Sequence, residues 1–547
     1  MTLTTSRLGI TNSLFVALLG VNTYTLASVL IPHSTLTLTN QLIAPDGFQR
    51  SAIVVNGEHP GPLIQATKGD GFMVNVVNQL TDPTMQRAAS VHWHGLSQRG
   101  TNWADGATGV NQCPISPNHS FEYTFTGGDS QAGTFWYHSH YFLQYCDGLR
   151  GPLVIYDPED PWKNLYDVDD ESTVLTLADW YHTPFPSIPG FPLPESTLIN
   201  GKGRYPDGPN VDLSIVNVEK GKRYRFRLVS LACETSYLFG IDGHQLQVIE
   251  TDGQNTVPVV VDKLRIFAGQ RYSFVLDANQ NIDNYWVRSL PANGMPKLVA
   301  GYEGGINSAI LRYRGAPISD PQTNDNQNLI LLEEAKLVPA QDPFPPGNPT
   351  AGGADFNVTL NFVLDVDLAS GEPQFKLNDK VYRPPSVPIL LKILSGARRP
   401  EELLPEGNLF SVPRDKVIEV TVPGGIAAGP HPMHLHGHTF SVVKSAGKNN
   451  QPNYLTPVRR DVTATSQEVD DYITIRFTTD NPGPWLLHCH LNKHHESGMV
   501  VVFVADVDSV AEENPVPDAW NDLCPIYDAL SDAEKEVKIV SSLPMPV

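Results

Sequence analysis

The chain has 547 residues, about three to four average domains, so it must fold around more than one core. With 41% hydrophobic and only 18% charged residues, plus 46 prolines and 43 glycines, its composition excludes a disordered or coiled-coil chain and indicates a loop-rich globular protein. The net charge of −21 excludes binding of nucleic acid or anionic lipid through a basic surface.

The first 27 residues are typical of a secretory signal. Arg7 supplies the positive charge, residues 14–21 (LFVALLGV) form a short apolar core, and residues 25–28 (TLAS) provide small side chains at the exit. We expect cleavage somewhere between residues 27 and 34. The alternative interpretation is a short buried helix.

Other features also favour secretion. Asn118 and Asn357 each begin an N-x-S/T motif for N-glycosylation. After the signal, no stretch is apolar for long enough to span a bilayer. We therefore expect an extracellular protein with no membrane anchor.

Strand signals dominate from about residue 35 to residue 505. Residues 224–231 (YRFRLVSL) and 271–278 (RYSFVLDA) are rich in β-branched and aromatic side chains and are bounded by Gly, Asp and Asn. Helical patterns are confined mostly to residues 506–537. The sequence therefore predicts an all-β protein built from several β-sandwiches or barrels.

A histidine pattern occurs twice along the chain. HWHG (92–95) is followed by FWYHSH (135–140), and HLHG (434–437) is followed by WLLHCH (485–490). The middle third has only His182 and His244. We therefore predict two metal-bearing domains that flank one without metal, and place the three at residues 28–160, 161–320 and 321–547.

The paired histidines predict metal binding. Alternate residues of a strand point to one face, so an H-x-H pair can present two imidazoles to neighbouring metals. A single pair is a weak signal, because buried hydrogen-bonded histidines are common. Four pairs in a duplicated pattern are hard to explain without metal. The eight imidazoles are His92, His94, His138, His140, His434, His436, His488 and His490.

The segment HCHLNKHHESGM (488–499) places a thiol between two of these imidazoles. If His488 and His490 point to one side of a strand, Cys489 points to the other side. The thiol would then serve a different metal while remaining covalently joined to the first cluster.

The same segment has the spacing of a blue-copper site. Cys489-x4-His494-x4-Met499 offers a thiolate, an imidazole and a weak axial thioether, and His431 is the candidate for the second imidazole. Zinc is the alternative metal, but a zinc site closes tetrahedrally and gains nothing from a thioether.

The chain has five cysteines, an odd number for a secreted protein. Cys489 belongs to the metal pattern, so the other four could form two disulfides. Three pairings are possible, and the spacing does not choose among them.

These motifs resemble those of a known family. HWHG, WYHSH, HPMHLHGH and HCHLNKHHESGM are similar to the four copper-binding segments of the multicopper oxidases. GTNWADG, QYCDGLRGPLVIYDP, LINGKGR, GKRYRFRLVSL and TDNPGPWLLHCH are similar to segments of the secreted fungal laccases. The resemblance runs from about residue 35 to about residue 535.

The resemblance implies three consecutive cupredoxin-like Greek-key domains. It also implies a secreted, monomeric laccase that uses four copper ions, oxidises phenols and aromatic amines one electron at a time, and reduces O2 to water. Lignin degradation, pigment formation and detoxification of phenols all remain open as physiological roles.

The resemblance further implies a ligand set. The type 1 copper would be held by His431, Cys489 and His494, with Met499 in the axial position. The type 2 copper would be held by His92 and His434, and the type 3 pair by His94, His138 and His490 on one ion and by His140, His436 and His488 on the other. The implied disulfides are Cys146–Cys233 and Cys113–Cys524, which leaves Cys489 free.

Two carboxylates acquire roles from the same resemblance. Asp105, in NWADG, would lie near the cluster and help to supply protons, unless it only makes a turn. Glu234, after Cys233, would contact the substrate and accept the phenolic proton, unless it is a solvated surface residue.

Four positions depart from the usual fungal pattern. Asn492 replaces a carboxylate, so proton supply would depend more on Asp105. Met499 replaces Leu or Phe, and a coordinating thioether would lower the type 1 potential; the alternative is that it only packs there. Lys493 and His495 replace apolar residues, and we expect His495 to lie outside the set of ligands.

Two other functions remain as alternatives. A related metallo-oxidase, such as a ferroxidase or an ascorbate oxidase, would share the fold. A copper electron-transfer protein without oxygen chemistry would need only the blue site, and the eight paired histidines argue against it.

Overall fold

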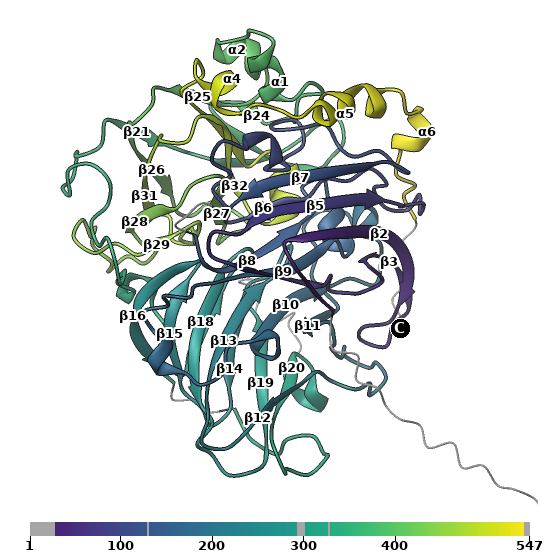
Figure 1. Ribbon diagram of the computed structural model, residues 1–547, viewed down its shortest axis with the longest axis vertical. Helices are drawn as coiled ribbons and strands as arrows, with labels where there is room; N and C mark the ends of the chain where they lie inside the picture. The colour runs from purple at the N-terminus through teal and green to yellow at the C-terminus, as the bar shows by residue number, and fades with distance from the viewer. Residues whose placement is uncertain (1–27, 128–130, 293–300, 326–328, 541–547) are drawn as a thin grey trace, which may run out of the picture.

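The computed structural model describes residues 28–127, 131–292, 301–325 and 329–540. The expected signal at residues 1–27 lies outside the described residues. Three pairs of β-sheets follow one another along the chain, and Figure 1 shows them as purple and blue, teal, and green to yellow bodies that all touch. The prediction of an all-β protein is confirmed. None of the helices in these ranges is both long and apolar enough to cross a membrane.

The first domain consists of two sheets around one apolar core. In the strand SFEYTFT (120–126), Phe121, Tyr123 and Phe125 are buried and the residues between them are exposed, as expected for a strand with one face in the core. One sheet has the order β1 (Val29–Leu30), β4 (Leu63–Thr67), β9 (Arg150–Tyr156), β8 (Gly133–His138) and β6 (His92–His94). The other has the order β3 (Arg50–Val55), β2 (His33–Ile43), β5 (Gly71–Asn78) and β7 (Ser120–Thr126).

The middle domain contains the two strands singled out from the sequence, which are β13 and β18 and pair in antiparallel register. Its first sheet has the order β11 (Ser196–Ile199), β10 (Val174–Trp180), β13 (Arg223–Ser230), β18 (Arg271–Asp277), β15 (Leu246–Thr251) and β16 (Gln254–Val261). Its second sheet has the order β12 (Ile215–Val218), β20 (Ser308–Tyr313), β19 (Asn284–Pro291), β14 (Tyr237–Ile241) and β17 (Lys263–Ile266).

The third domain repeats the two-sheet design. One sheet has the order β21 (Phe356–Thr359), β26 (Val417–Pro423), β31 (Tyr472–Thr478), β28 (Phe440–Lys444) and β29 (Arg459–Arg460). The other has the order β25 (Leu409–Val412), β33 (Val500–Ala505), β32 (Gly483–Cys489), β27 (Pro432–Leu435) and β30 (Val462–Ala464). A small sheet consists of β22 (Val363–Val366), β23 (Pro373–Leu377) and β24 (Lys380–Val381).

The helices are short. Within the predicted helical region lie α4 (Val510–Glu513), α5 (Asp518–Asp528) and α6 (Asp532–Lys535). The sequence did not indicate α1 (Ile389–Leu394), α2 (Pro400–Leu403) or α3 (Asn492–Glu496), and α3 occupies the metal-binding segment. Short 3-10 helices are η1 (Asn102–Ala104), η2 (Gln144–Asp147), η3 (Lys163–Leu165), η4 (Glu171–Thr173), η5 (Phe185–Ser187), η6 (Glu303–Gly305) and η7 (Glu334–Lys336).

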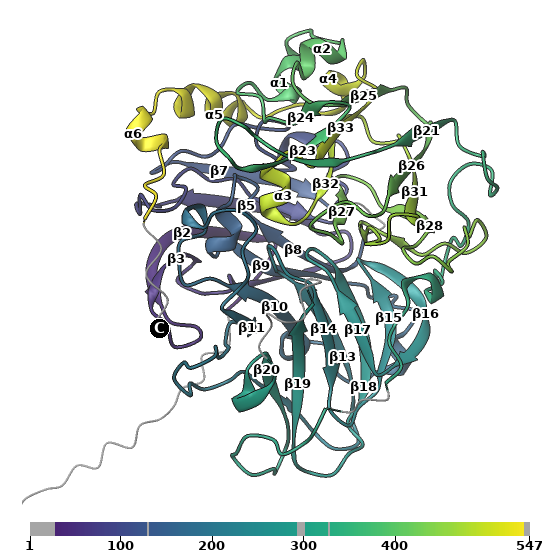
Figure 2. The ribbon, with the colours of Figure 1, turned by 180° about the vertical axis from the view of Figure 1, so that it is seen from behind.

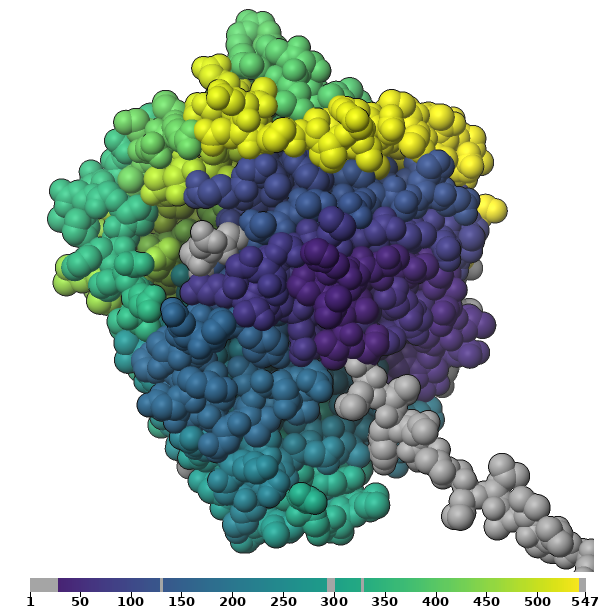
Figure 3. Space-filling model, in the orientation of Figure 1, coloured from purple at the N-terminus to yellow at the C-terminus, as the bar shows by residue number. Residues whose placement is uncertain are grey.

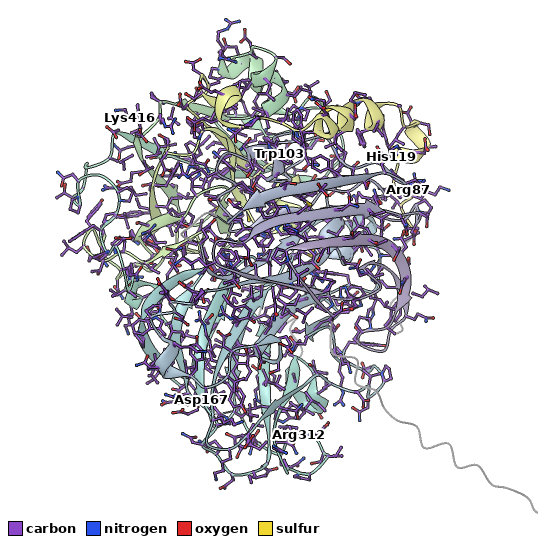
Figure 4. All side chains as sticks on the ribbon, viewed as in Figure 1. Arg87, Trp103, His119, Asp167, Arg312 and Lys416 are labelled. Atoms are coloured by element: carbon purple, nitrogen blue, oxygen red, sulfur yellow. A yellow bond between two sulfur atoms is a disulfide. The ribbon has the colours of Figure 1, made fainter. Side chains whose placement is uncertain are left out.

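The C-terminal segment returns to the first domain. Figure 3 shows it in yellow along the edge of the purple and blue surface, and a disulfide between Cys113 and Cys524 fixes α5 there. Arg87, labelled beside this segment in Figure 4, donates a hydrogen bond to the carbonyl of Ala533 (2.5 Å). The second disulfide, Cys146–Cys233, joins the first domain to the middle one. Both implied pairings are therefore confirmed, and Cys489 is the free cysteine among the described residues.

Candidate metal centre

The eight paired histidines meet where the first and third domains face each other. In the first domain β6 pairs with β8 so that His92 lies opposite His138. In the third domain β27 pairs with β32 so that His434 lies opposite His488. The duplicated sequence pattern thus has the same strand register in both domains, and Figure 1 shows the labels of β6, β8, β27 and β32 close together at the centre of the molecule.

One histidine pair shows why this cluster fits a cation. His436 Nδ1 donates to a carboxylate oxygen of Asp105 (2.8 Å), and His488 Nδ1 donates to the carbonyl of Cys489 (2.8 Å). Burial holds the pKa of both imidazoles well below the ordinary value, so neither ring carries a second proton. Their Nε2 lone pairs nevertheless face each other at 3.0 Å. Two acceptors at that distance require a positive ion that both can bind.

A second pair repeats this geometry across the domain interface. His92 and His434 each donate Nδ1–H to a backbone carbonyl, at 2.7 and 2.9 Å, and their Nε2 atoms lie 3.5 Å apart. In a third pair, Nδ1 of His94 faces Nε2 of His490 at 3.1 Å. Unlike His436 and His488, which both belong to the third domain, each of these two pairs joins the first domain to the third.

The other two histidines complete the cluster. His138 donates Nδ1–H to the carbonyl of Ser139 (2.8 Å), and its buried Nε2 has no hydrogen-bond partner among the described residues. His140 lies with His436 and His488, and one nitrogen of each falls within 4.8 Å of the others. All eight rings therefore present nitrogen ligands to one small buried region.

Two aspartates hold this cluster in a crossed arrangement. The backbone carbonyl of Asp105 accepts from His92 of its own domain, and its carboxylate accepts from His436 of the third domain. The backbone carbonyl of Asp461 accepts from His434 of its own domain, and its carboxylate accepts from Nε2 of His94 in the first domain (3.0 Å). Each aspartate therefore fixes one ring on each side of the interface and selects the nitrogen that remains free.

The loop that carries Asp105 approaches its neighbouring strand very closely. Gly106 follows Asp105 with φ +86°, and a Cβ atom there would lie 2.0 Å from the carbonyl oxygen of Val91. Only glycine allows both this conformation and this approach. The motif NWADG therefore places the Asp105 carboxylate directly beside His92 and His436.

A separate site lies on the other side of β32. Cys489 Sγ is 3.7 Å from Nδ1 of His431 and 3.7 Å from Nδ1 of His494, and the two nitrogens are 3.0 Å apart. This triangle leaves room for one ion at about 2 Å from each atom, the usual bond length of a first-row metal to imidazole or thiolate. Burial raises the pKa of the Cys489 thiol, so the thiolate needs a cation beside it.

Backbone hydrogen bonds hold Met499 beside this site. Its carbonyl accepts from the amide of Cys489 (3.1 Å), its amide donates to the carbonyl of His494 (3.0 Å), and its side chain is fully buried. The binding of its sulfur to the ion stays a prediction. The ring of Phe191 packs against His494, with 4.4 Å between their centroids.

The second predicted carboxylate, Glu234, lies on the same side as the thiol site. It is 7% exposed and accepts from the backbone amide of Lys493 (2.6 Å), the residue before His494. Burial raises the pKa of Glu234 to about 8, against the effect of that hydrogen bond. The interpretation of Glu234 as a solvated surface residue is therefore excluded.

Asn492 and His495, two of the positions that differ from the usual fungal pattern, lie between the two metal sites. Both residues line a small cavity with His138, His140 and His488. The ring of His495 packs edge-on against His488, with 4.8 Å between centroids, and its Nδ1 lies 3.0 Å from the Glu496 carboxylate. Figure 2 shows the short helix α3, which carries both residues, beside β27 and β32.

Sequence reasoning missed Asp461 and the anchoring role of Lys493. Asp461 stands in VRRDV (458–462), and its burial among the histidines is visible only in the folded structure. The Lys493 ammonium donates to the carbonyl of Ile188 (2.6 Å), and nothing in the spacing of the segment indicates that contact.

Replacing Asp105 by Ala tests the crossed arrangement. His92 would keep the backbone carbonyl as its partner, but His436 would lose the acceptor that fixes its ring. We expect the metal affinity of the eight-histidine cluster to fall about 10- to 100-fold, while the Cys489 site keeps its metal. Metal content after dialysis against a graded chelator measures this, and equal loss from both sites would contradict it.

Comparison with known proteins agrees with this geometry. Sequence models described as multicopper oxidase match residues 37–160, 171–316 and 382–509. The chain is 53% identical over 508 residues to Laccase-1 of Trametes villosa, covering 92% of this chain and 95% of the relative. It is 51% identical to Laccase-1 of Pleurotus ostreatus over 513 residues, covering 92% and 94%. A leucine-to-methionine mutant of the laccase from Botrytis aclada has a similar structure, with a TM-score of 0.78 at 30% identity and coverage of 94% and 95%. The chain therefore belongs to the multicopper oxidase family and is an oxidoreductase of its fungal laccase group.

Proposed function

We propose that this oxidoreductase is a secreted laccase that oxidises phenols and aromatic amines and reduces O2 to water. Copper bound at the two sites would supply the one-electron oxidation of the substrate and the four-electron reduction of O2. The family supports copper as the metal, and the number and type of ions are part of the proposal.

The donor atoms support four ions. His431, Cys489 and His494 would hold a type 1 ion, with Met499 as the axial residue, and His92 and His434 would hold a type 2 ion. We assign one type 3 ion to His94, His138 and His490, of which His94 and His490 face each other at 3.1 Å. We assign the other to His140, His436 and His488, which each bring a nitrogen within 4.8 Å of the others.

One observation carries the proposal. Cys489 reaches the His431 and His494 nitrogens, and the residues directly before and after it each reach the cluster: His488 lies 3.0 Å from His436, and His490 lies 3.1 Å from His94. A single extended segment thus joins the two sites through a few covalent bonds. An electron-transfer protein without oxygen chemistry would need the Cys489 site but not the histidine cluster.

The chain's own carboxylates would handle protons. Glu234 lies beside the residue that precedes His494, so its carboxylate can accept the proton that a phenol loses with its electron. Asp105 has one buried carboxylate oxygen, Oδ1, without a hydrogen-bond partner in the described structure. That oxygen can take a proton and return it beside the cluster, where the Asn492 amide has no acid to offer.

Several features support secretion. The two disulfides persist in an oxidising compartment rather than in the cytosol. Asn118 and Asn357, the two expected glycosylation sites, are both exposed. Arg7 and the apolar run after it have the pattern of a leader that the secretion machinery removes.

Two substitutions test the coupled reaction. Cys489→Ser should remove the blue absorption and oxidation of a methoxyphenol together, because the thiolate is the ligand that gives a type 1 ion its character. His140→Ala should abolish oxygen uptake and keep the blue absorption, because His140 reaches only the cluster. The measurements are copper content, visible spectrum and oxygen consumption. Blue absorption that persists in copper-loaded Cys489→Ser protein would contradict the proposal.

Replacing Glu234 by Gln tests its role as a base. Below its pKa of about 8 Glu234 is protonated and resembles Gln, and as the pH rises toward 8 the carboxylate accumulates. The ratio of wild-type to Glu234→Gln kcat/KM for a phenol should therefore rise with pH, to about tenfold or more. Ferrocyanide, which loses an electron and no proton, is the control and should give a flat ratio. A ratio for the phenol that is equally flat would rule out this role.

Replacing Met499 by Leu tests the axial residue. The two side chains have similar volumes, so the free energy of unfolding should change by less than about 1.5 kcal/mol. If the thioether binds copper, its loss should raise the type 1 potential, because sulfur stabilises the oxidised ion. A spectroscopic redox titration of both proteins measures this. An unchanged or lower potential would mean that Met499 only packs there.

A further inference from the structure

The middle domain has no paired histidines, yet one of its turns contacts the histidine cluster. The turn at residues 267–270 joins β17 to β18, and Arg271 begins β18. Gly269 lies at the tip with φ +82°, where a Cβ atom would come within 2.8 Å of the His490 ring and 3.0 Å of the His94 ring. The absence of a side chain here lets the backbone lie directly against two rings of the cluster.

The turn is bound to both metal-bearing domains. Gln270 donates its side-chain amide to the carbonyl of Val462 in the third domain (3.0 Å). Arg271 Nε donates to the carbonyl of Thr134 in the first domain (3.0 Å). The turn therefore lies between the two halves of the cluster and contacts each of them.

The guanidinium of Arg271 also binds Asp461 with two parallel hydrogen bonds. Its two terminal nitrogens lie 2.7 and 2.6 Å from the two carboxylate oxygens, and Arg271 is fully buried. Such a bidentate pair fixes the plane of the carboxylate as well as its charge. The oxygen that faces Nε2 of His94 is thereby held in place, and Nδ1 of His94 is left to face His490.

We propose that Arg271 is a positioning residue of the histidine cluster. Through it the middle domain fixes the orientation of the His94 ring and the nitrogen that His94 offers to a metal. Without the guanidinium, Asp461 would be a buried, uncompensated charge, free to rotate away from His94. The effect should be confined to the cluster, since the contacts recorded for Arg271 do not include His431, Cys489 or His494.

The experiment compares two lysine substitutions in the full-length copper-loaded protein. Arg271→Lys keeps the positive charge but loses the two-pronged geometry. The matched control is Arg288→Lys, because Arg288 is also a buried arginine of the middle domain bound to an aspartate, Asp242, by two hydrogen bonds of 2.8 Å. The contacts recorded for that pair include none of the histidine ligands.

We expect both variants to lose thermal stability and only Arg271→Lys to lose copper selectively. Its cluster copper should be removed by a graded chelator at about 10- to 100-fold lower concentration than in wild type, with the blue absorption retained and the electron paramagnetic resonance signal of type 2 copper altered. Equal copper retention in Arg271→Lys and wild type would overturn the inference, as would equal copper loss in the two variants.

A second variant covers the case in which Arg271→Lys does not fold. The double substitution Arg271→Met with Asp461→Asn removes both buried charges, which is much less damaging than removing one. It should show the same selective loss of cluster copper, and full retention would again overturn the inference. The inference rests on the proposed copper sites, but the two fail differently: wild-type protein that binds no copper would refute the proposed function, whereas wild-type affinity in these variants would refute only the role of Arg271.

Discussion

Nitrogen lone pairs that face each other inside the protein impose the main constraint on this structure. His436 and His488 donate their Nδ1 protons to oxygen acceptors, and burial keeps both rings neutral, so the two Nε2 atoms at 3.0 Å can share only a cation. The same arrangement joins His92 to His434 across the interface between the first and third domains. A bound cation is therefore also a link between domains, and the fold and the metal site depend on each other.

The β-strand supplies the second constraint. Because successive side chains point to opposite faces, β32 can place Cys489 on one side while His488 and the following His490 reach the other. A helix would put neighbouring side chains about 100° apart and would not separate two sites so cleanly. The duplicated register, with His92 opposite His138 and His434 opposite His488, shows that both domains contribute to the cluster through the same antiparallel pairing of two strands.

The sequence predicted the β-class, the convergence of the paired histidines and the free cysteine, because these follow from residue type and a spacing of two. It did not predict α3, because four of its five residues are charged or titratable and the segment has no apolar face that would indicate a helix. Asp461 and Arg271 were also missed. Their partners lie 367 and 190 positions away in the chain. No local pattern encodes such contacts, which arise only when three domains have assembled.

The middle domain has no paired histidines, but it contributes buried charged residues to both metal sites. On the cluster side it contributes Arg271, which holds Asp461. On the thiol side it contributes Asp179, which accepts from the backbone amides of Cys233 and Glu234 and from Arg150 of the first domain. Glu234 in turn accepts from the amide next to His494. Both sites are thus completed by a buried acid–arginine pair that spans two domains, and because such a pair is costly to break from one side, the three domains are held in the one arrangement that keeps the two sites in register.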